Sequence, residues 1–156
     1  MSFPLAVSND SVSSVLSSIS GCYDYVRWYD PLDSSDHWKP YLPGRSHNDL
    51  TRLDNAMGFW INITATCDFT LSGARPVSTT IDLRQGWNMV GFPSFNTTYT
   101  VADMKADIGL AGVRVEAFDA SAAPYCLQRV SDSYVMMAGE GYWVYVPADA
   151  TWTVGG

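Results

Sequence analysis

The feature that most constrains this chain is an internal repeat, because two similar halves must fold into two similar units. The segment Ala56–Gly73 aligns without a gap with Gly139–Gly156, at an offset of 83 residues. Five of the 18 aligned positions are identical, and five more are conservative replacements. The identical pairs are Gly58/Gly141, Trp60/Trp143, Ala65/Ala148, Thr70/Thr153 and Gly73/Gly156. Self-similarity at a fixed offset indicates a repeated structural unit.

A second alignment extends the repeat toward the N-terminus. Ser11–Asp30 aligns with Thr100–Asp119 at an offset of 89, and Phe3-Pro4 meets Phe92-Pro93 at the same offset. The first half therefore has six more residues between Asp30 and Gly58 than the second half has at the matching place. We predict a single domain made of a first repeat unit, residues 1–73, and of a linking strand with a second unit, residues 74–156. Unit one lacks a Gly-Trp-Asn strand before Phe3, so the repeat pattern suggests a chain that begins partway through a unit.

Local patterns assign strands and two short helices to these units. Val12 to Ile19 and Val101 to Ile108 place apolar residues at helical spacing, and Thr100 with Asp103 resembles a capping box. The expected strands are Tyr23–Tyr29, Gly58–Ile63, Val113–Phe118 and Gly141–Val146, with hairpin partners at Asp68–Leu71 and Thr151–Val154 and a further hairpin within Thr79–Val90. The predicted fold class is therefore mainly β with two short helices (α+β), arranged as a pseudo-two-fold pair.

Neither half, at about 75 residues, is large enough to bury by itself the apolar surface that a stable core needs. We therefore expect the two units to share one hydrophobic core. The residues expected at or near it are Phe59, Trp60, Ile61, Tyr142, Trp143 and Val144.

Two segments of the second half resemble a repeat found in secreted archaeal and bacterial surface proteins. They are Gly86–Ser94, with the sequence GWNMVGFPS, and Ala138–Val146, with AGEGYWVYV. The Gly-Tyr-Trp part is matched more loosely in the first half as Ala-Met-Gly-Phe-Trp, and the Gly-Trp-Asn part is matched only once. The resemblance implies an extracellular stalk, S-layer-associated or accessory module, whose partners are neighbouring domains or surface proteins of one assembly. It brings no catalytic residues with it.

Composition narrows the possible partners. The net charge of −7 and the scattered basic residues argue against binding to nucleic acid, which needs clustered Lys and Arg. No apolar run approaches the roughly 20 residues of a membrane helix, so membrane insertion is not expected. Cys22, Cys67 and Cys126 are an odd number, so at most one internal bridge can form; the simpler interpretation is three small buried side chains.

The extra segment of unit one, residues 30–54, is the main candidate for a binding site, because insertions on a rigid scaffold often carry function. A divalent metal is one candidate ligand, with Asp33, Asp36, His37, His47 and Asp49 as possible ligands, although their spacing fits no known motif. Carbohydrate is the other, with Trp28, Trp38 and Tyr41 as the rings that could stack on sugar faces. Asp, Ser and Pro are also the residues that an ordinary solvent-exposed loop contains, so the composition of this segment does not require a ligand.

No catalytic motif is present: the chain has no GxSxG elbow, no phosphate-binding loop and no Cys-His neighbours. Three sequons, at Asn9, Asn62 and Asn96, could carry glycans in a secreted chain. We therefore predict a non-catalytic structural or adhesive module of a secreted or cell-surface protein, without a required cofactor. The alternative is a carbohydrate- or metal-binding module that uses the 30–54 segment, with a hydrolase as a less favoured case.

Overall fold

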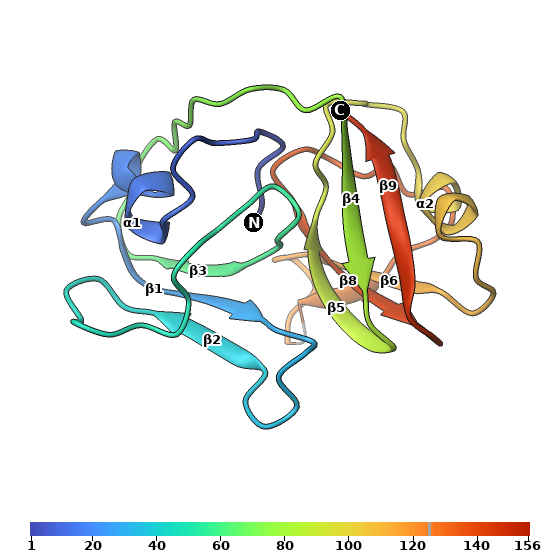
Figure 1. Ribbon diagram of the computed structural model, residues 1–156, viewed down its shortest axis with the longest axis horizontal. Coiled ribbons are helices and arrows are strands. Elements are labelled where there is room, and N and C mark those ends of the chain that lie inside the picture. Colours follow the sequence, from blue (N-terminus) through green and yellow to red (C-terminus); the bar gives the residue numbers. More distant parts are fainter. Residues whose placement is uncertain (125) are drawn as a thin grey trace.

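The computed structural model describes residues 1–124 and 126–156, and Figure 1 shows the arrangement of their elements. The chain is mainly β and carries two α-helices, which confirms that part of the predicted fold class. In chain order the elements are α1 (Val12–Val15), the short 3-10 helix η1 (Ser17–Ile19), β1 (Tyr23–Tyr29), β2 (Trp38–Tyr41), β3 (Trp60–Ile63), β4 (Ser78–Leu83), β5 (Gly86–Gly91), α2 (Val101–Ile108), β6 (Arg114–Phe118), β7 (Leu127–Arg129), β8 (Gly141–Val146) and β9 (Ala150–Gly155).

The first half, residues 1–73, is built on a three-stranded antiparallel sheet with the order β2-β1-β3. The helical segment that precedes this sheet lies beside it (Figure 1). Its apolar side chains Val12, Val15 and Ile19 are buried, as the helical spacing predicts, and pack in one cluster with Val26 and Phe59. This half therefore has a hydrophobic cluster of its own.

The second half, residues 74–156, contains a four-stranded antiparallel sheet with the order β5-β8-β6-β7 and a separate pair, β4-β9. In β8 the side chains alternate, so that Tyr142, Val144 and Val146 are buried while Trp143 and Tyr145 lie on the opposite face and are half-buried. The buried face packs with α2 and with Trp152 of β9 in a second cluster. One face of this sheet is thus core, and its other face is aromatic.

The helix α2 begins and ends where its sequence predicts. The Thr100 hydroxyl accepts a hydrogen bond from the Asp103 backbone N–H, and the Asp103 carboxylate accepts one from the Thr100 backbone N–H, which confirms the capping box. Gly109 ends the helix in the left-handed conformation, with φ of 70°. No helix in the described part of the chain has the length and hydrophobicity needed to cross a membrane.

Two expectations about packing are wrong. The buried apolar residues form two clusters, one in each half, instead of one shared core. The predicted hairpins do not form either: β9 pairs with β4 along its whole length, from Ser78↔Gly155 to Leu83↔Ala150, while β8 pairs with β5 and β6. Residues 68–71 form no strand. Of the six residues expected in the shared core, Trp60, Ile61 and Trp143 are only half-buried.

The two halves meet through backbone at a pair of glycines. A Cβ at Gly58 would lie 3.2 Å from the Gly141 Cα, and a Cβ at Gly141 would lie 3.2 Å from the Gly58 Cα. The backbones on the two sides can approach this closely only because neither residue has a side chain. The identity of this pair in the sequence alignment therefore has a packing reason.

Four further contacts between the halves form two matched pairs. The ring of Trp60 lies 5.2 Å from that of Phe118, and the ring of Trp143 lies 5.0 Å from that of Tyr29, both edge to face. In the same way the Gly91 N–H donates to the Ala56 carbonyl at 2.9 Å, and the Ser2 N–H donates to the Gly139 carbonyl at 2.8 Å. In each pair, the residues of one contact align in sequence with those of the other.

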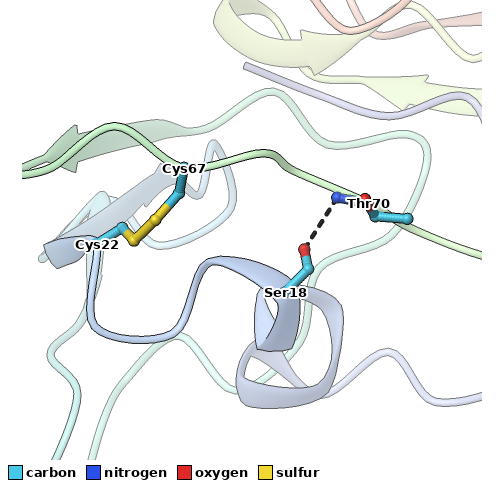
Figure 2. Close-up of a disulfide and its surroundings, with 4 residues drawn as sticks. All are labelled: Ser18, Cys22, Cys67 and Thr70. Atoms are coloured by element: carbon cyan, nitrogen blue, oxygen red, sulfur yellow. Dashed lines mark hydrogen bonds between the residues drawn. A yellow bond between two sulfur atoms is a disulfide. The ribbon is translucent and has the colours of Figure 1, made fainter.

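A disulfide joins Cys22, just before β1, to Cys67, after β3, with 6.3 Å between their Cα atoms. Figure 2 shows it beside a hydrogen bond from the Thr70 backbone N–H to the Ser18 hydroxyl, which fixes the same segment to η1. Cys126 is free. The interpretation of all three cysteines as small buried side chains is wrong, since Cys67 is exposed and the other two are half-buried.

Candidate functional site

The aromatic face of the second-half sheet follows directly from strand alternation. Trp87 of β5 pairs with Tyr145 of β8, and Arg114 of β6 pairs with Tyr145 from the other side. These side chains therefore share one face, opposite the buried residues of the same strands. The ring centroids of Trp87 and Tyr145 are 5.5 Å apart, and those of Trp87 and Trp143 are 6.4 Å apart. The result is a row of half-buried rings along one sheet.

The first half extends this row with rings from β1 and β2. Tyr29 and Trp38 face each other across these strands, with centroids 5.5 Å apart. Tyr29 also stacks on the imidazole of His37 at 4.6 Å. The Trp38 ring reaches across to Trp143 at 5.9 Å, and 39% of Trp38 remains exposed. The extra segment of unit one thus supplies two members of the row, and it does so from the other half of the molecule.

We call this set the aromatic surface. It consists of Tyr29, His37, Trp38, Trp87, Trp143 and Tyr145.

Polar groups lie among the rings of the aromatic surface. The Arg114 guanidinium lies 4.0 Å from the centroid of the Tyr145 ring and 5.5 Å from that of Trp87, in cation–π geometry. Glu116 pairs with Trp143 and lines a hollow of about 330 Å³ with Tyr29, Trp87, Leu127 and Trp143. The indole N–H of Trp143 is buried and finds no acceptor within the described residues. A buried donor without an acceptor costs free energy, and because this nitrogen is inaccessible to solvent no ligand reaches it in this arrangement of rings.

Of the three rings predicted from sequence, only Trp38 belongs to the aromatic surface. Trp28 points to the other side of β1, as expected from its place beside Tyr29, and lines a cleft between the halves. Tyr41 is half-buried and packs against the first-half cluster. Trp143 was predicted as core, yet it contributes to the surface, because it alternates with the buried Tyr142 and Val144.

Three of the five predicted metal ligands, Asp33, His37 and His47, make other polar contacts. Asp33 accepts hydrogen bonds from the Ser35 and Asp36 backbone N–H groups and pairs with Lys39 at 2.5 Å. The Lys39 ammonium and the Ser35 hydroxyl hold the pKa of Asp33 well below its usual value. His47 is exposed, and its Nδ1 lies 2.7 Å from the adjacent carbonyl oxygen of Ser46. Asp36 and Asp49 are exposed as well.

The predicted ligands therefore do not come together as a metal site in this geometry. Throughout residues 1–124 and 126–156, no group of three His, Cys, Asp or Glu side chains could hold a metal ion. His37 nevertheless belongs to the aromatic surface, since its ring stacks on Tyr29, and its Nδ1 lies 2.8 Å from the Asp30 carbonyl oxygen.

The cleft that Trp28 lines is larger than the hollow beside Glu116 and has a volume of about 520 Å³. The 30–54 segment forms one side and β4 with β5 the other. Both of its basic residues are neutralised by aspartates: Lys39 pairs with Asp33, and Arg52 with Asp54. We place the candidate site on the aromatic surface, because rings from both halves converge there beside the Glu116 carboxylate and the Arg114 guanidinium.

Comparison of the chain with protein-family models, with curated proteins and with solved structures found no match.

Proposed function

We propose that this chain is a non-catalytic, adhesive module that binds carbohydrate through the aromatic surface. The observation that carries the proposal is the convergence of Trp38, Trp87 and Trp143, from three strands of two sheets, on one partly exposed face. Flat rings stack on the apolar C–H faces of sugar rings, and partly exposed rings that are already held in place lose little entropy on binding.

The polar groups beside the rings suit the hydroxyl groups of a sugar. Arg114 is a donor, and the Glu116 carboxylate is an acceptor. An open hollow of about 330 Å³ has room for one or two sugar units and leaves a longer chain in solvent. This geometry favours a terminal or internal part of an oligosaccharide over a small buried ligand.

The number of carboxylates that line the hollow favours binding over hydrolysis. Glycoside hydrolysis ordinarily uses two carboxyl groups that flank the scissile bond, about 5–9.5 Å apart. Glu116 is the one carboxylate among the described residues that line the hollow. We therefore assign it a hydrogen-bonding role.

The disulfide supports an extracellular location, because such bonds persist in oxidising compartments and are rare in the cytosol. The three sequon asparagines, Asn9, Asn62 and Asn96, are all exposed, which is what a glycosylated surface requires. Both observations agree with the location expected from the resemblance to secreted surface proteins, and with partners among neighbouring surface proteins.

We also propose that the two halves arose by duplication and are related by a pseudo-two-fold axis near Gly58 and Gly141. The order β2-β1-β3 in the first half matches β7-β6-β8 in the second. The paired ring contacts and the paired backbone hydrogen bonds between the halves are what a two-fold interface produces, since each contact then occurs twice.

The test is a glycan-array screen followed by titration of the best ligand. Replacing Trp38 by Ala should weaken binding by about 5- to 150-fold, because one stacking ring contributes about 1–3 kcal/mol by analogy with stacking on bases. The matched control is Phe95→Ala, since Phe95 is 43% exposed and lies outside the aromatic surface. Equal affinities for the two variants, or no glycan bound by the parent protein, would sink the proposal.

A further inference from the structure

The three sequons of the chain lie in different backbone surroundings. They begin at Asn9, Asn62 and Asn96, and all three asparagines are exposed, so exposure alone does not distinguish them. Glycosylation of a folded protein also requires the sequon to enter the active site of a transferase. Each hydrogen bond that ties the backbone of the sequon to another segment must break before this happens. The sequons therefore differ in reactivity according to those bonds.

The sequon at Asn62 is part of a sheet. Asn62 of β3 pairs with Tyr25 of β1, and the Thr64 N–H donates to the Cys22 carbonyl at 2.7 Å. The side-chain nitrogen Nδ2 of Asn62, which is the atom that a glycan would join, donates to a carboxylate oxygen of Asp24 at 2.9 Å. Both the backbone of this sequon and its reacting nitrogen are thus held in the folded protein.

The sequon at Asn9 is tied to the segment that carries Arg52 and Leu53. The Leu53 N–H donates to the carbonyl of Asp10, the middle residue of the sequon, at 2.8 Å. Ser11, its third residue, forms an antiparallel bridge with Arg52 and is half-buried. A transferase therefore has access to this sequon only after the bridge has opened.

The sequon at Asn96 lies in the loop between β5 and α2 and has no such ties. Residues 95–98 are all exposed, and within the described part of the chain no backbone–backbone hydrogen bond joins them to another segment. The backbone N–H of Asn96 donates to the nearby Ser94 hydroxyl at 3.1 Å. This loop can therefore leave the surface without the loss of any sheet or bridge hydrogen bond.

The side chain of Asn96 leaves its nitrogen available. Its Oδ1 accepts hydrogen bonds from the backbone N–H and from the hydroxyl of Thr98, each at 2.9 Å. Because the oxygen and the nitrogen lie on opposite sides of the amide carbon, Nδ2 faces away from this turn. The reacting atom is thus directed outward, in contrast to that of Asn62.

There is room beside Asn96 for an attached sugar. A hollow of about 450 Å³ has Asn96, Thr98, Tyr99, Asp103 and Asp107 in its lining. The Asp107 carboxylate accepts a hydrogen bond from the Tyr99 hydroxyl and retains further lone pairs that can accept from sugar hydroxyl groups. A first sugar on Asn96 can therefore lie against α2 without displacing a packed side chain.

We propose that Asn96 accepts an N-linked glycan on the folded protein, in preference to Asn9 and Asn62. The donor is an oligosaccharide joined to a lipid through a diphosphate. A bond forms between Nδ2 of Asn96 and the anomeric carbon of the first sugar, and the bond from that carbon to the diphosphate oxygen breaks. The diphosphate leaves with the electron pair, and the proton lost from Nδ2 passes to a base of the transferase. The inference rests on the extracellular location proposed above and is independent of carbohydrate binding by the aromatic surface.

The test is glycosylation of the folded, disulfide-bonded chain by a purified oligosaccharyltransferase with a lipid-linked oligosaccharide. The enzyme is one that modifies all three sequons in the reduced, unfolded chain, so that its sequence preference does not decide the result. Peptide mapping by mass spectrometry should give an initial rate at Asn96 at least about tenfold above those at Asn9 and Asn62, which must wait for local opening. Equal rates at the three sites, or an unmodified folded chain, would overturn the proposal.

Two neighbouring threonines supply a matched pair of variants. Thr98→Ala removes the hydroxyl that the sequon needs and should abolish modification at Asn96, whereas Thr97→Ala keeps the Asn-x-Thr pattern and should retain it. Both positions are exposed, so Tm should be nearly unchanged in each variant. Modification that persists in Thr98→Ala, or that is lost in Thr97→Ala, would contradict the assignment.

A third variant tests whether local opening sets the rates. Removal of the Cys22–Cys67 disulfide, which closes the loop that contains β3, should raise the rate at Asn62 and leave the rate at Asn96 unchanged. An unchanged rate at Asn62 would refute the role given to backbone pairing. Thr98→Ala should also leave glycan binding by the aromatic surface unchanged, so that this proposal and the proposed function fail separately.

Discussion

Removal of the Cys22–Cys67 disulfide should destabilise the first half selectively. The bond closes a loop with a sequence separation of 45 residues that contains all of β1, β2 and β3. The two hydrophobic clusters are separate, so the second-half cluster does not depend directly on this loop. The appropriate change is Cys22→Ser with Cys67→Ser, made in a Cys126→Ser background so that no stray thiol can exchange.

The size of the effect follows from the loop length. A cross-link that closes a loop of about 45 residues removes about 13 cal/mol/K of chain entropy from the unfolded state, or about 4 kcal/mol at 25 °C. In a chain of 156 residues this corresponds to a fall in Tm of about 8–16 °C, since each kcal/mol shifts Tm by about 2–4 °C. The hydrogen bond from Thr70 to Ser18 survives the change and holds the segment after Cys67 in place.

The assay is thermal unfolding of the variant and of its parent, followed by hydrogen exchange of both halves. We expect faster exchange in β1 and β3 and little change in β6 and β8. A thiol titration supplies the control: the unmodified native protein should contain one free thiol, that of Cys126. Three free thiols in material purified without reductant, or equal Tm values, would refute the reasoning.

Three further outcomes test the packing. Gly58→Ala should cost about 1–3 kcal/mol, since its methyl group would overlap the facing backbone carbonyl of β5, whereas Gly155→Ala, with open space around it, should be neutral in the same urea titration. Trp152→Ala, at a fully buried position, should cost about 3–5 kcal/mol, and a loss below about 1 kcal/mol would contradict its place in the core. Burial raises the pKa of Tyr99 and Tyr142 above the ordinary 10.0, so their stabilising contribution should hold below pH 10 and be lost at higher pH. In an alkaline titration both phenols should ionise only on unfolding.

Elements with a strong local signal were predictable from the sequence. Strands Tyr23–Tyr29 and Gly141–Val146 have the predicted bounds, and so does the α2 capping box, because alternation, helical spacing and caps act within a few residues. The pairing of β9 with β4 was not predictable in this way. Their partners are 67 to 77 residues apart in sequence, and the choice between β4 and β8 depends on which faces must be buried.

The candidate site was only partly predictable for a related reason. Trp38 could be chosen because it lies in the extra segment, but its companions Trp87 and Trp143 come from the other half. Alternation in Gly141–Val146 already separates Trp143 from Tyr142 and Val144, so sequence could have placed it on the face opposite the core. What sequence could not supply is that β1 and β2 of the first half would lie over that face.

Under the proposed two-fold relation, equivalent positions of the two halves can acquire different surroundings once the halves diverge at a few places. The contacts Trp143–Tyr29 and Trp60–Phe118 are equivalent under the proposed two-fold relation. Around Trp143, β5 adds Trp87 and the longer connection of the first half adds Trp38, so the ring becomes part of the proposed sugar-binding face. Within the described residues Trp60 contacts one aromatic ring, that of Phe118. Divergence outside the strand that carries the tryptophan is therefore enough, in our proposal, to make one of two equivalent rings part of a carbohydrate site.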